Sequence, residues 1–335
     1  MTMIELPLRI GHATDDQMKS GVSVILPDKP AIASCHVAGG GPGTRETDLL
    51  SPENTVEAVD AIVLSGGSAF GLAAADGVAA WLAGQGRGFA VGGARVPIVP
   101  SAILFDLLNN GDKSPIPGMG PERQSPYSAL GRKACETASA DVAQGSVGAG
   151  TGCTLADVKG GFGAASAALR GGGSLTAFVA VNAAGTATFA KSHYLRAAAF
   201  ERDGEFGGYG LPSPLPEGSD VPATKLSAEP GGNTTIAVIA TDLSLSKAQL
   251  KRLAIAAHDG IALAVYPAHT PLDGDTVFTL STSETAAPAS LADLTEASAL
   301  AASTLARAIG CAVAQAKPSA GDRIPVWASL CPQDA

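Results

Sequence analysis

Aromatic residues are scarce in this sequence: Phe, Trp and Tyr together make up 4% of its 335 residues. Charged residues are also few, at 16%, whereas hydrophobic residues reach 46%. A disordered chain has the opposite balance of low hydrophobicity and high charge, so this composition excludes a largely disordered protein. A chain of this length can bury a large core, as one large domain or as two.

Basic residues are too few to suggest a nucleic-acid partner. The 22 Lys and Arg are outnumbered by 31 Asp and Glu, which gives a formal net charge of −9. Proteins that bind nucleic acids neutralise phosphates with clustered lysine and arginine. We therefore expect no nucleic-acid partner.

Neither the cysteines nor the histidines form a metal-binding pattern. The number of cysteines is odd and no C-x-x-C pair occurs, so a disulfide framework and a zinc site are both unexpected and a reducing compartment fits best. The histidines show no H-E-x-x-H or other ligand spacing. The sequence thus predicts neither a metal nor an organic cofactor.

The sequence shows no secretory signal and no membrane-spanning segment that we recognise. The first residues, MTMIELPLRIGHATDD, reach acidic side chains too early for a secretory signal. The most apolar window, residues 61–83, is interrupted by Asp76 and several glycines, which indicates a buried strand–turn–helix unit. We therefore expect a cytoplasmic protein without a membrane partner.

Short β-branched runs alternate with alanine-rich stretches, which is typical of an α/β or α+β protein. The predicted strands are 22–26, 31–37, 61–64, 175–182, 234–241 and 276–282, with 102–107 a further short apolar segment. The predicted helices are 69–83, 126–143, 245–264 and 291–316. Residues 186–190 could form a hairpin with strand 175–182, and residues 201–232 read as a long exposed loop.

The end of that loop, at Asn233-Thr234, allows two interpretations. The loop could be a domain linker or a surface excursion before a strand. It could also present a processing site, because a threonine hydroxyl can attack the preceding carbonyl and the resulting ester can be opened by water. The new α-amine, with an ordinary pKa of about 7.7–8.0, is suited to act as a base for the exposed Thr234 nucleophile.

Three further features, one turn and two single residues, have both a structural and a functional interpretation. Asp273-Gly274-Asp275 could be an Asp-Gly turn with solvated carboxylates, or two coupled carboxylates beside one nucleophile. Lys159, in a glycine-rich stretch, could be a solvated charge or an ammonium that faces a site. Asn182, at a strand end, could be a turn former or an oxyanion donor.

Two glycine-rich motifs lack the residues of better-known sites. The run GGGPGT at 39–44 has no Gly-Lys-Ser/Thr ending, which a phosphate-binding P-loop requires. The run SGGS at 65–68 does not match the G-x-S-x-G nucleophile elbow. Phosphate binding by the 39–44 run and a Ser-His-Asp hydrolase are both disfavoured.

Motifs along nearly the whole chain resemble, in the same order, the self-cleaving N-terminal-nucleophile aminopeptidases. That family includes L-aminopeptidase/D-amino-acid esterases, β-peptidyl aminopeptidases and nylon-oligomer endo-hydrolases. The motifs are VAGGGPGTRET (37–47), LSGGSAFGLAAADGVAAWL (64–82), VPIVPSAILFDL (96–107), GAGTG (148–152), KGGFG (159–163), VAVNAAG (179–185), GNTTIAVIATD (232–242) and HTPLDGDTVF (269–278).

The resemblance implies a four-layer α/β/β/α sandwich in a single domain, 1–335. It further implies autocleavage between Asn233 and Thr234 into a large subunit, 1–233, and a small subunit, 234–335, which stay together. We expect these processed heterodimers to assemble into a homo-oligomer.

The resemblance also implies the roles of the site residues. Thr234 matches the nucleophile, Asp273 and Asp275 match the acidic pair of the nylon-hydrolase branch, and Asn182 matches an asparagine at the end of a V-x-V-N strand. Lys159 heads the K-G-G-x-G motif and matches the active-site lysine. Some members have an oxyanion-site tyrosine where this chain has Phe105, so oxyanion stabilisation would rest on Asn182 and backbone N–H groups.

We therefore predict an amide hydrolase that acts on a small peptide or amide. An aminopeptidase for small N-terminal residues is the first expectation, and a nylon-type oligoamide hydrolase is the second within the family. The sequence also leaves open acyl transfer like that of ornithine acetyltransferases, which self-cleave before a threonine as well. It leaves open, too, an unprocessed oligomer that binds a small ligand without catalysis.

Overall fold

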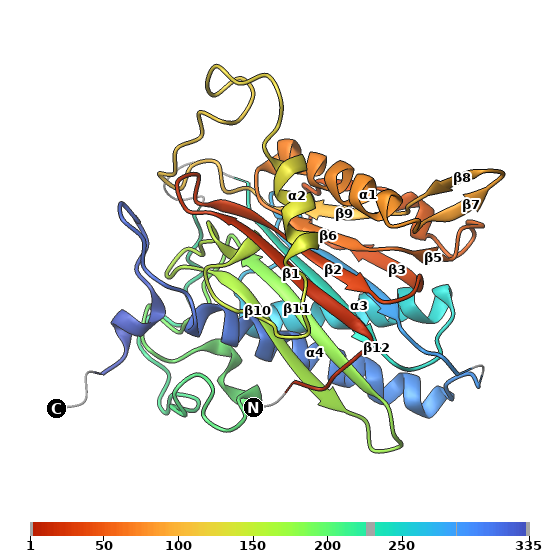
Figure 1. Ribbon diagram of the computed structural model, residues 1–335. Helices are drawn as coiled ribbons and strands as arrows, with labels where there is room; N and C mark the ends of the chain where they lie inside the picture. The colour runs from red at the N-terminus through yellow and green to blue at the C-terminus, as the bar shows by residue number, and fades with distance from the viewer. Residues whose placement is uncertain (1–2, 226–231, 286, 333–335) are drawn as a thin grey trace.

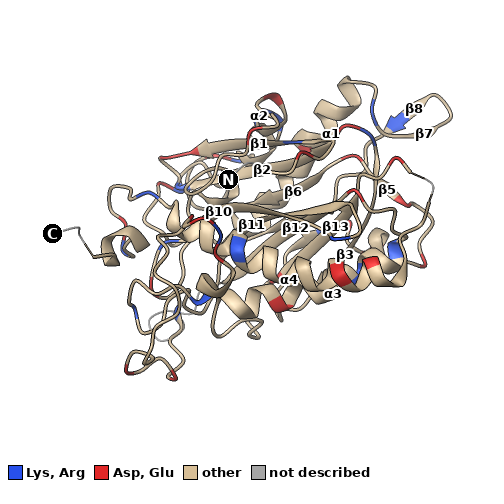
Figure 2. Ribbon diagram, turned by 90° about the horizontal axis from the view of Figure 1, so that it is seen from below, with Lys and Arg blue, Asp and Glu red and all other residues tan. Residues whose placement is uncertain are grey.

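The chain folds into four layers, with two stacked β-sheets between two pairs of helices. The computed structural model describes residues 3–225, 232–285 and 287–332. Seen along the sheets, one helix pair lies above the first sheet and the other pair below the second (Figure 2). This is the α/β/β/α sandwich expected from the resemblance.

The first sheet has the strand order β1-β2-β6-β9-β4. Its long strands β1 (Leu8–Asp15) and β2 (Ser20–Pro27) form an antiparallel hairpin. The shorter strands are β6 (Ile62–Ser65), β9 (Ser101–Ile103) and β4 (Thr44–Arg45). Strands β6 and β9 are parallel, whereas the other neighbours are antiparallel.

The second sheet has the order β10-β11-β12-β13-β3-β5 and carries the predicted site residues. At its centre β12 (Thr234–Thr241) pairs antiparallel with β11 (Ser174–Asn182) and parallel with β13 (Thr276–Ser281). The remaining strands are β10 (Gly161–Ala168), β3 (Ala31–Val37) and β5 (Ala58–Val59). Every residue of β11, β12 and β13 is buried, because the sheet is covered on both faces.

The helices cover the outer faces of the sheets (Figure 1). Helices α1 (Ala74–Gly84) and α2 (Tyr127–Glu136) pack together over the first sheet. Helices α3 (Lys247–Ala264) and α4 (Leu291–Ala314) pack together over the second. A small exposed hairpin, β7 (Phe89–Val91) and β8 (Ala94–Val96), projects from the helix α1 side.

Each interface between layers has its own hydrophobic cluster. One lies between the two sheets and includes Phe162, Phe178 and Phe278. A second lies between the second sheet and helices α3 and α4, and a third between the first sheet and helices α1 and α2. The cores are built from small aliphatic side chains, which explains how so few aromatics suffice.

Helix α4 is the one helix within residues 3–225, 232–285 and 287–332 that is long and apolar enough, by length and composition alone, to cross a membrane. It packs against β10, β11 and α3, and 67% of its apolar window is buried within the protein. The core helix of a folded domain passes the same test, so this finding is weak evidence for a membrane span.

Most predicted elements are confirmed, while two helices differ in their bounds and one predicted hairpin is wrong. The helix predicted at 126–143 ends at Glu136, and the helix predicted at 69–83 starts as a 3-10 helix (Ser68–Ala73) before α1. The hairpin predicted for 186–190 is wrong, because β11 pairs with β10 and β12 instead. Residues 201–225 contain no α-helix or strand, as predicted, while 226–231 lie outside the described residues.

Candidate active site

The start of β12, the end of β11 and the turn before β13 meet at one edge of the second sheet. The strand register places Thr234 opposite Asn182, and Asn233 forms a parallel bridge with Asp273. The predicted site residues at this edge are at most 4% exposed. Residues distant in the sequence are thus brought together by strand pairing.

The hydroxyl of Thr234 lies against the carbonyl of the residue before it. Thr234 Oγ1 donates a hydrogen bond to the carbonyl oxygen of Asn233. The same carbonyl oxygen accepts the backbone N–H of Gly274 at 2.8 Å. The Asn233 carbonyl oxygen therefore accepts from two donors, the Thr234 hydroxyl and the Gly274 N–H, and both polarise the carbonyl.

Asp275 holds two backbone segments and one imidazole. Its Oδ1 accepts the N–H of Thr235 at 2.7 Å. Its Oδ2 accepts the backbone N–H of His269 at 3.1 Å and lies 2.7 Å from His269 Nδ1. Because Thr235 follows the predicted nucleophile directly, Asp275 fixes the start of β12.

Asp273 is also bound by backbone donors. Its oxygens accept the N–H groups of Ala184 at 3.2 Å and Thr270 at 2.8 Å. Burial, reinforced by the negative charge of Asp275, raises the pKa of Asp273. Among the described contacts, neither carboxylate reaches the hydroxyl of Thr234, so in this uncleaved state the acidic pair braces the backbone around it.

The amide of Asn182 is held at both ends. Its Oδ1 accepts the N–H of Thr154 at 3.0 Å, and its Nδ2 donates to the carbonyl oxygen of Phe105 at 2.8 Å. Asn182 therefore faces Thr234 across the strand ladder, while its amide donor is engaged by Phe105. Phe105, which stands where some family members have a tyrosine, contributes only its backbone carbonyl to this contact.

Lys225 belongs to the site, although the sequence analysis did not single it out. Its Nζ lies 3.3 Å from both the backbone oxygen and Oδ1 of Asn182. Burial lowers the pKa of Lys225 to about 7, although the negative charge of Asp273 opposes this shift. A signal was present: Lys225 is the only lysine in the 201–232 loop that leads to the predicted cleavage site.

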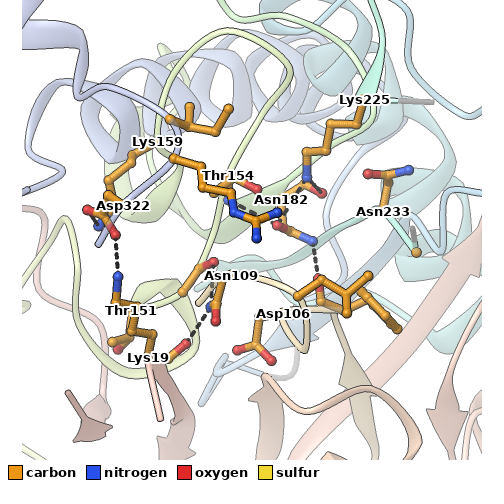
Figure 3. Close-up of a pocket in the computed structure, with 16 residues that line it drawn as sticks. Lys19, Asp106, Asn109, Thr151, Thr154, Lys159, Asn182, Lys225, Asn233 and Asp322 are labelled. Atoms are coloured by element: carbon orange, nitrogen blue, oxygen red, sulfur yellow. Dashed lines mark hydrogen bonds and ion pairs between the residues drawn. The ribbon is translucent and has the colours of Figure 1, made fainter. Parts of the chain in front are cut away.

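A cavity of about 290 Å³ lies beside this edge of the sheet, and Asn182, Lys225 and Asn233 line it. Lys159 lines it as well. Figure 3 shows Lys159, Asp322 and Lys19 at one side of this cavity and Asn233 at the other. The carboxylate of Asp322 accepts hydrogen bonds from Lys159 at 2.7 Å and from Lys19 at 2.8 Å. Lys159 is therefore a cavity residue, and its ammonium is bound to Asp322.

Three histidines form a row behind Asp275. The rings of His36 and His258 are 5.1 Å apart, and those of His258 and His269 are 5.0 Å apart. Burial lowers the pKa of His258 to about 4, so this ring is neutral near pH 7. Within the part of the chain that the structure describes, no group of three or more His, Cys, Asp or Glu side chains is placed to hold a metal ion.

Sequence comparisons relate the chain to peptidases. The profile of peptidase family S58 matches residues 7–324. An uncharacterized aminopeptidase of Mycobacterium tuberculosis is 43% identical over 327 residues, covering 93% of this chain and 90% of the relative. The 6-aminohexanoate-oligomer endohydrolase of an Agromyces species is 27% identical over 288 residues, covering 82% and 73%.

Two solved structures have the same fold. The β-aminopeptidase of a Burkholderia species superposes with a TM-score of 0.67 and 22% identity, covering 97% of this chain and 90% of that chain. The L-aminopeptidase D-Ala-esterase/amidase of Ochrobactrum anthropi, described as a variant of the Ntn-hydrolase fold, gives a TM-score of 0.67 and 22% identity, covering 96% and 87%. These similarities establish an Ntn-hydrolase fold.

Proposed function

The chain belongs to peptidase family S58, and from this premise we propose that it is an amide hydrolase activated by its own cleavage between Asn233 and Thr234. In this proposal Thr234 is the N-terminal nucleophile of the processed enzyme. The products of cleavage are a large subunit, 1–233, and a small subunit, 234–335, which remain associated through the shared second sheet.

One observation carries the proposal: the hydroxyl of Thr234 contacts the carbonyl that it would attack. That carbonyl also accepts the N–H of Gly274, a donor fixed by the turn between Asp273 and Asp275. As negative charge develops on the Asn233 oxygen, this hydrogen bond strengthens. A positioned oxyanion donor is worth about 2.7–4 kcal/mol of transition-state stabilisation.

The processing step needs a base and an acid. Thr234 Oγ1 bonds to the Asn233 carbonyl carbon as a base removes the hydroxyl proton. The carbon–nitrogen bond then breaks, and a proton returns to the nitrogen of Thr234, leaving an ester. Water adds to this ester and releases a carboxylic acid on Asn233 and a free hydroxyl and α-amine on Thr234.

We assign the proton transfer in processing to Lys225. Its amine contacts Asn182, which faces Thr234 across the β11–β12 ladder. With a pKa lowered to about 7, a large fraction of this amine is neutral and able to accept a proton near neutral pH.

In the processed enzyme the α-amine of Thr234 takes over as base. Asp275, through the N–H of Thr235, and Asp273, through the neighbouring turn, hold the start of β12 in place. The donors for the substrate oxyanion are the backbone N–H of Gly274 and the Asn182 amide N–H that is not donated to the Phe105 carbonyl, because the Phe105 side chain has no hydroxyl. Water then releases the acyl group from Thr234.

We propose small peptides or amides as the substrate class. The relatives named aminopeptidases support removal of an N-terminal residue. The more distant relatives named 6-aminohexanoate-oligomer endohydrolases, together with the Asp273-Gly274-Asp275 turn, support oligoamide hydrolysis as the second candidate.

The test is the mass and N-terminal sequence of purified protein. We expect two fragments, 1–233 and 234–335, and Edman degradation of the small one should give Thr-Thr-Ile-Ala. Thr234→Val removes the hydroxyl at nearly constant volume and should leave a single inactive chain. Thr235→Val is the matched control, since the Thr235 hydroxyl has no hydrogen-bond partner among the described residues, and it should process normally.

An active wild-type enzyme that remains a single chain would contradict the proposal, as would a Thr234→Val variant that still hydrolyses amides. Size-exclusion chromatography of the cleaved protein tests whether the two subunits stay together and assemble further. Separation of the fragments under native conditions would contradict the shared-sheet arrangement.

A further inference from the structure

The charges that line the cavity beside Asn233 differ from those of the whole protein. The chain as a whole carries −9. The cavity is lined by four basic side chains and only two acidic ones, and the basic ones are Lys19, Lys159, Lys225 and Arg323. A cavity with this balance attracts anions.

Both acidic side chains of the cavity are already engaged. Asp322 accepts from Lys19 and Lys159 and from the backbone N–H of Ser319 at 2.6 Å. Asp106 accepts from the Ser20 hydroxyl at 2.6 Å and the Gly67 N–H at 2.8 Å, and burial raises its pKa. Neither carboxylate is presented to a positively charged ligand.

One basic side chain is available to a ligand. Arg323 is exposed, lines the cavity, and makes no ion pair with any side chain in residues 3–225, 232–285 or 287–332. A guanidinium group suits the planar geometry of a carboxylate. The neighbouring Asp322 shows that Lys19 and Lys159 can hold a carboxylate between them at hydrogen-bonding distance.

The position of the cavity indicates which part of a substrate enters it. Gly232 and Asn233 line it, and they are the acyl side of the proposed scissile bond. Lys19 and Lys159 lie across the cavity from Asn233, whereas Lys225 lies on the same side as Asn233 (Figure 3). An acyl group whose carbonyl reaches Thr234 would extend toward these cations, and a cavity of about 290 Å³ suits a small group.

From these four observations we infer that the enzyme prefers amides whose acyl portion carries a carboxylate, such as an acidic N-terminal residue. Arg323 binds that carboxylate, and Lys19 and Lys159 add to the positive field while Asp322 partly neutralises it. This inference rests on the proposed function for the position of the scissile bond, but the binding site itself can be tested without catalysis.

The first test is binding to the full-length Thr234→Val chain, which keeps the uncleaved state described here. Titration calorimetry compares glutaramate with its neutral isostere glutaramide. We expect glutaramate to bind about tenfold more tightly, a difference of about 1.4 kcal/mol, and the preference to fall with added salt. Equal binding of the two compounds, or no binding of glutaramate, would overturn the inference.

Two variants and one control test whether the preference for glutaramate arises in the cavity. Arg323→Gln should abolish most of the preference for glutaramate, whereas Arg202→Gln, the same change at an exposed arginine outside the cavity, should retain it. Asp322→Asn should strengthen glutaramate binding, because it removes the competing carboxylate. A preference unchanged in Arg323→Gln, or binding weakened in a folded Asp322→Asn chain, would count against the assignment.

The kinetic test separates this inference from the proposed function. Processed wild-type enzyme should show a higher kcat/KM for the p-nitroanilide of glutamate than for that of glutamine. Hydrolysis of both at equal rates would overturn the substrate preference and leave the nucleophile proposal intact. Failure to process at all would overturn the nucleophile proposal, while the calorimetric comparison would still decide on the carboxylate site.

Discussion

Asp275 Oδ2 lies 2.7 Å from the Nδ1 of His269, while the other oxygen of Asp275 binds the backbone of Thr235. The imidazole is thereby coupled through one buried carboxylate to the start of the strand that carries Thr234. His269 also has a positive φ of 56°, a conformation that asparagine tolerates better than most residues. Asparagine at this position can therefore replace the Nδ1 donor without imposing backbone strain.

The stability contribution of His269 is predicted to depend on pH. Burial alone would lower the pKa of His269, but the hydrogen bond and charge of Asp275 outweigh burial and raise it. A histidine with a raised pKa stabilises the fold fully below its unfolded pKa of about 6.5, and this stabilisation is lost as the pH rises through the folded pKa. Wild type should therefore exceed His269→Asn in unfolding free energy most at acidic pH.

Urea unfolding at about pH 5.5 and about pH 9, on either side of the histidine pKa, measures this difference. His12 provides a control of opposite sign, because burial lowers its pKa to about 4. The advantage of wild type over His12→Asn should therefore grow as the pH rises. The same pH trend for both variants would refute the coupling of His269 to Asp275.

The fold can be predicted largely because its elements are marked locally. The apolar β-branched run at 234–241 is visible in the sequence and forms β12, and the helix predicted at 245–264 is α3, which the structure shows to be capped by Ser246. The end of α2 is harder to predict, since nothing between Glu136 and Ala143 signals a stop as clearly as glycine or proline would. The hairpin predicted for 186–190 is wrong because both edges of β11 are already occupied, one by the preceding strand β10 and the other by the more distant β12.

The site is predictable only in part. Thr234, Asp273 and Asp275 lie in short motifs, and the structure brings them together with Asn182. Lys225 and Asp322 meet the site through tertiary contacts: Asp322 is 163 residues from Lys159 in the sequence. No local pattern encodes such a pairing, and one sequence contains no measure of spatial proximity.

Gly274 is predicted to be essential for processing, because a side chain at this position would collide with the Thr234 hydroxyl. A Cβ added there would lie 2.7 Å from Thr234 Oγ1, too close for the hydroxyl to keep its position. Gly274→Ala should slow the appearance of the two fragments by about a hundredfold or more, since small misplacements of a reacting atom have effects of this size. The rate is followed on denaturing gels after expression.

Gly41→Ala is the matched control for this change. A Cβ at Gly41 would lie no closer than 3.7 Å to its nearest neighbour, the backbone of the same turn region at Leu272 and Pro271. This variant should process at the wild-type rate. Equal rates for Gly274→Ala and wild type would show that the Thr234 hydroxyl does not react from the observed position.

Lys247 is predicted to matter for stability rather than catalysis. Its buried ammonium donates to the carbonyl oxygens of Leu49, Asn54 and Val56, each at 3.0 Å, and so ties a loop to the start of α3. Lys247→Met leaves these carbonyls without that donor and should lower the unfolding free energy by about 2 kcal/mol or more. Lys251→Met, one turn along α3, should have a smaller effect in the same urea experiment, and an equal effect would mean that the three carbonyls do not depend on Lys247.

Lys225 is predicted to set the pH dependence of processing. Its pKa of about 7 means that the neutral amine, the form able to accept the Thr234 proton, increases as the pH rises from acidic values through 7. The cleavage rate of wild type should rise over this range and level off above it. Lys225→Met should cleave about a hundredfold more slowly, as expected for loss of a general base, and should lose the rise near pH 7.

The control for Lys225 is Lys317→Met, the same change at an exposed lysine outside the cavity, which should keep both the rate and the profile. Lysine at 225 also packs against Asn182, so a structural role must be distinguished from proton transfer. A structural role alone would lower the rate equally at every pH and leave the midpoint near 7. Because only proton transfer removes that midpoint, the shape of the profile, rather than the rate at one pH, identifies the base.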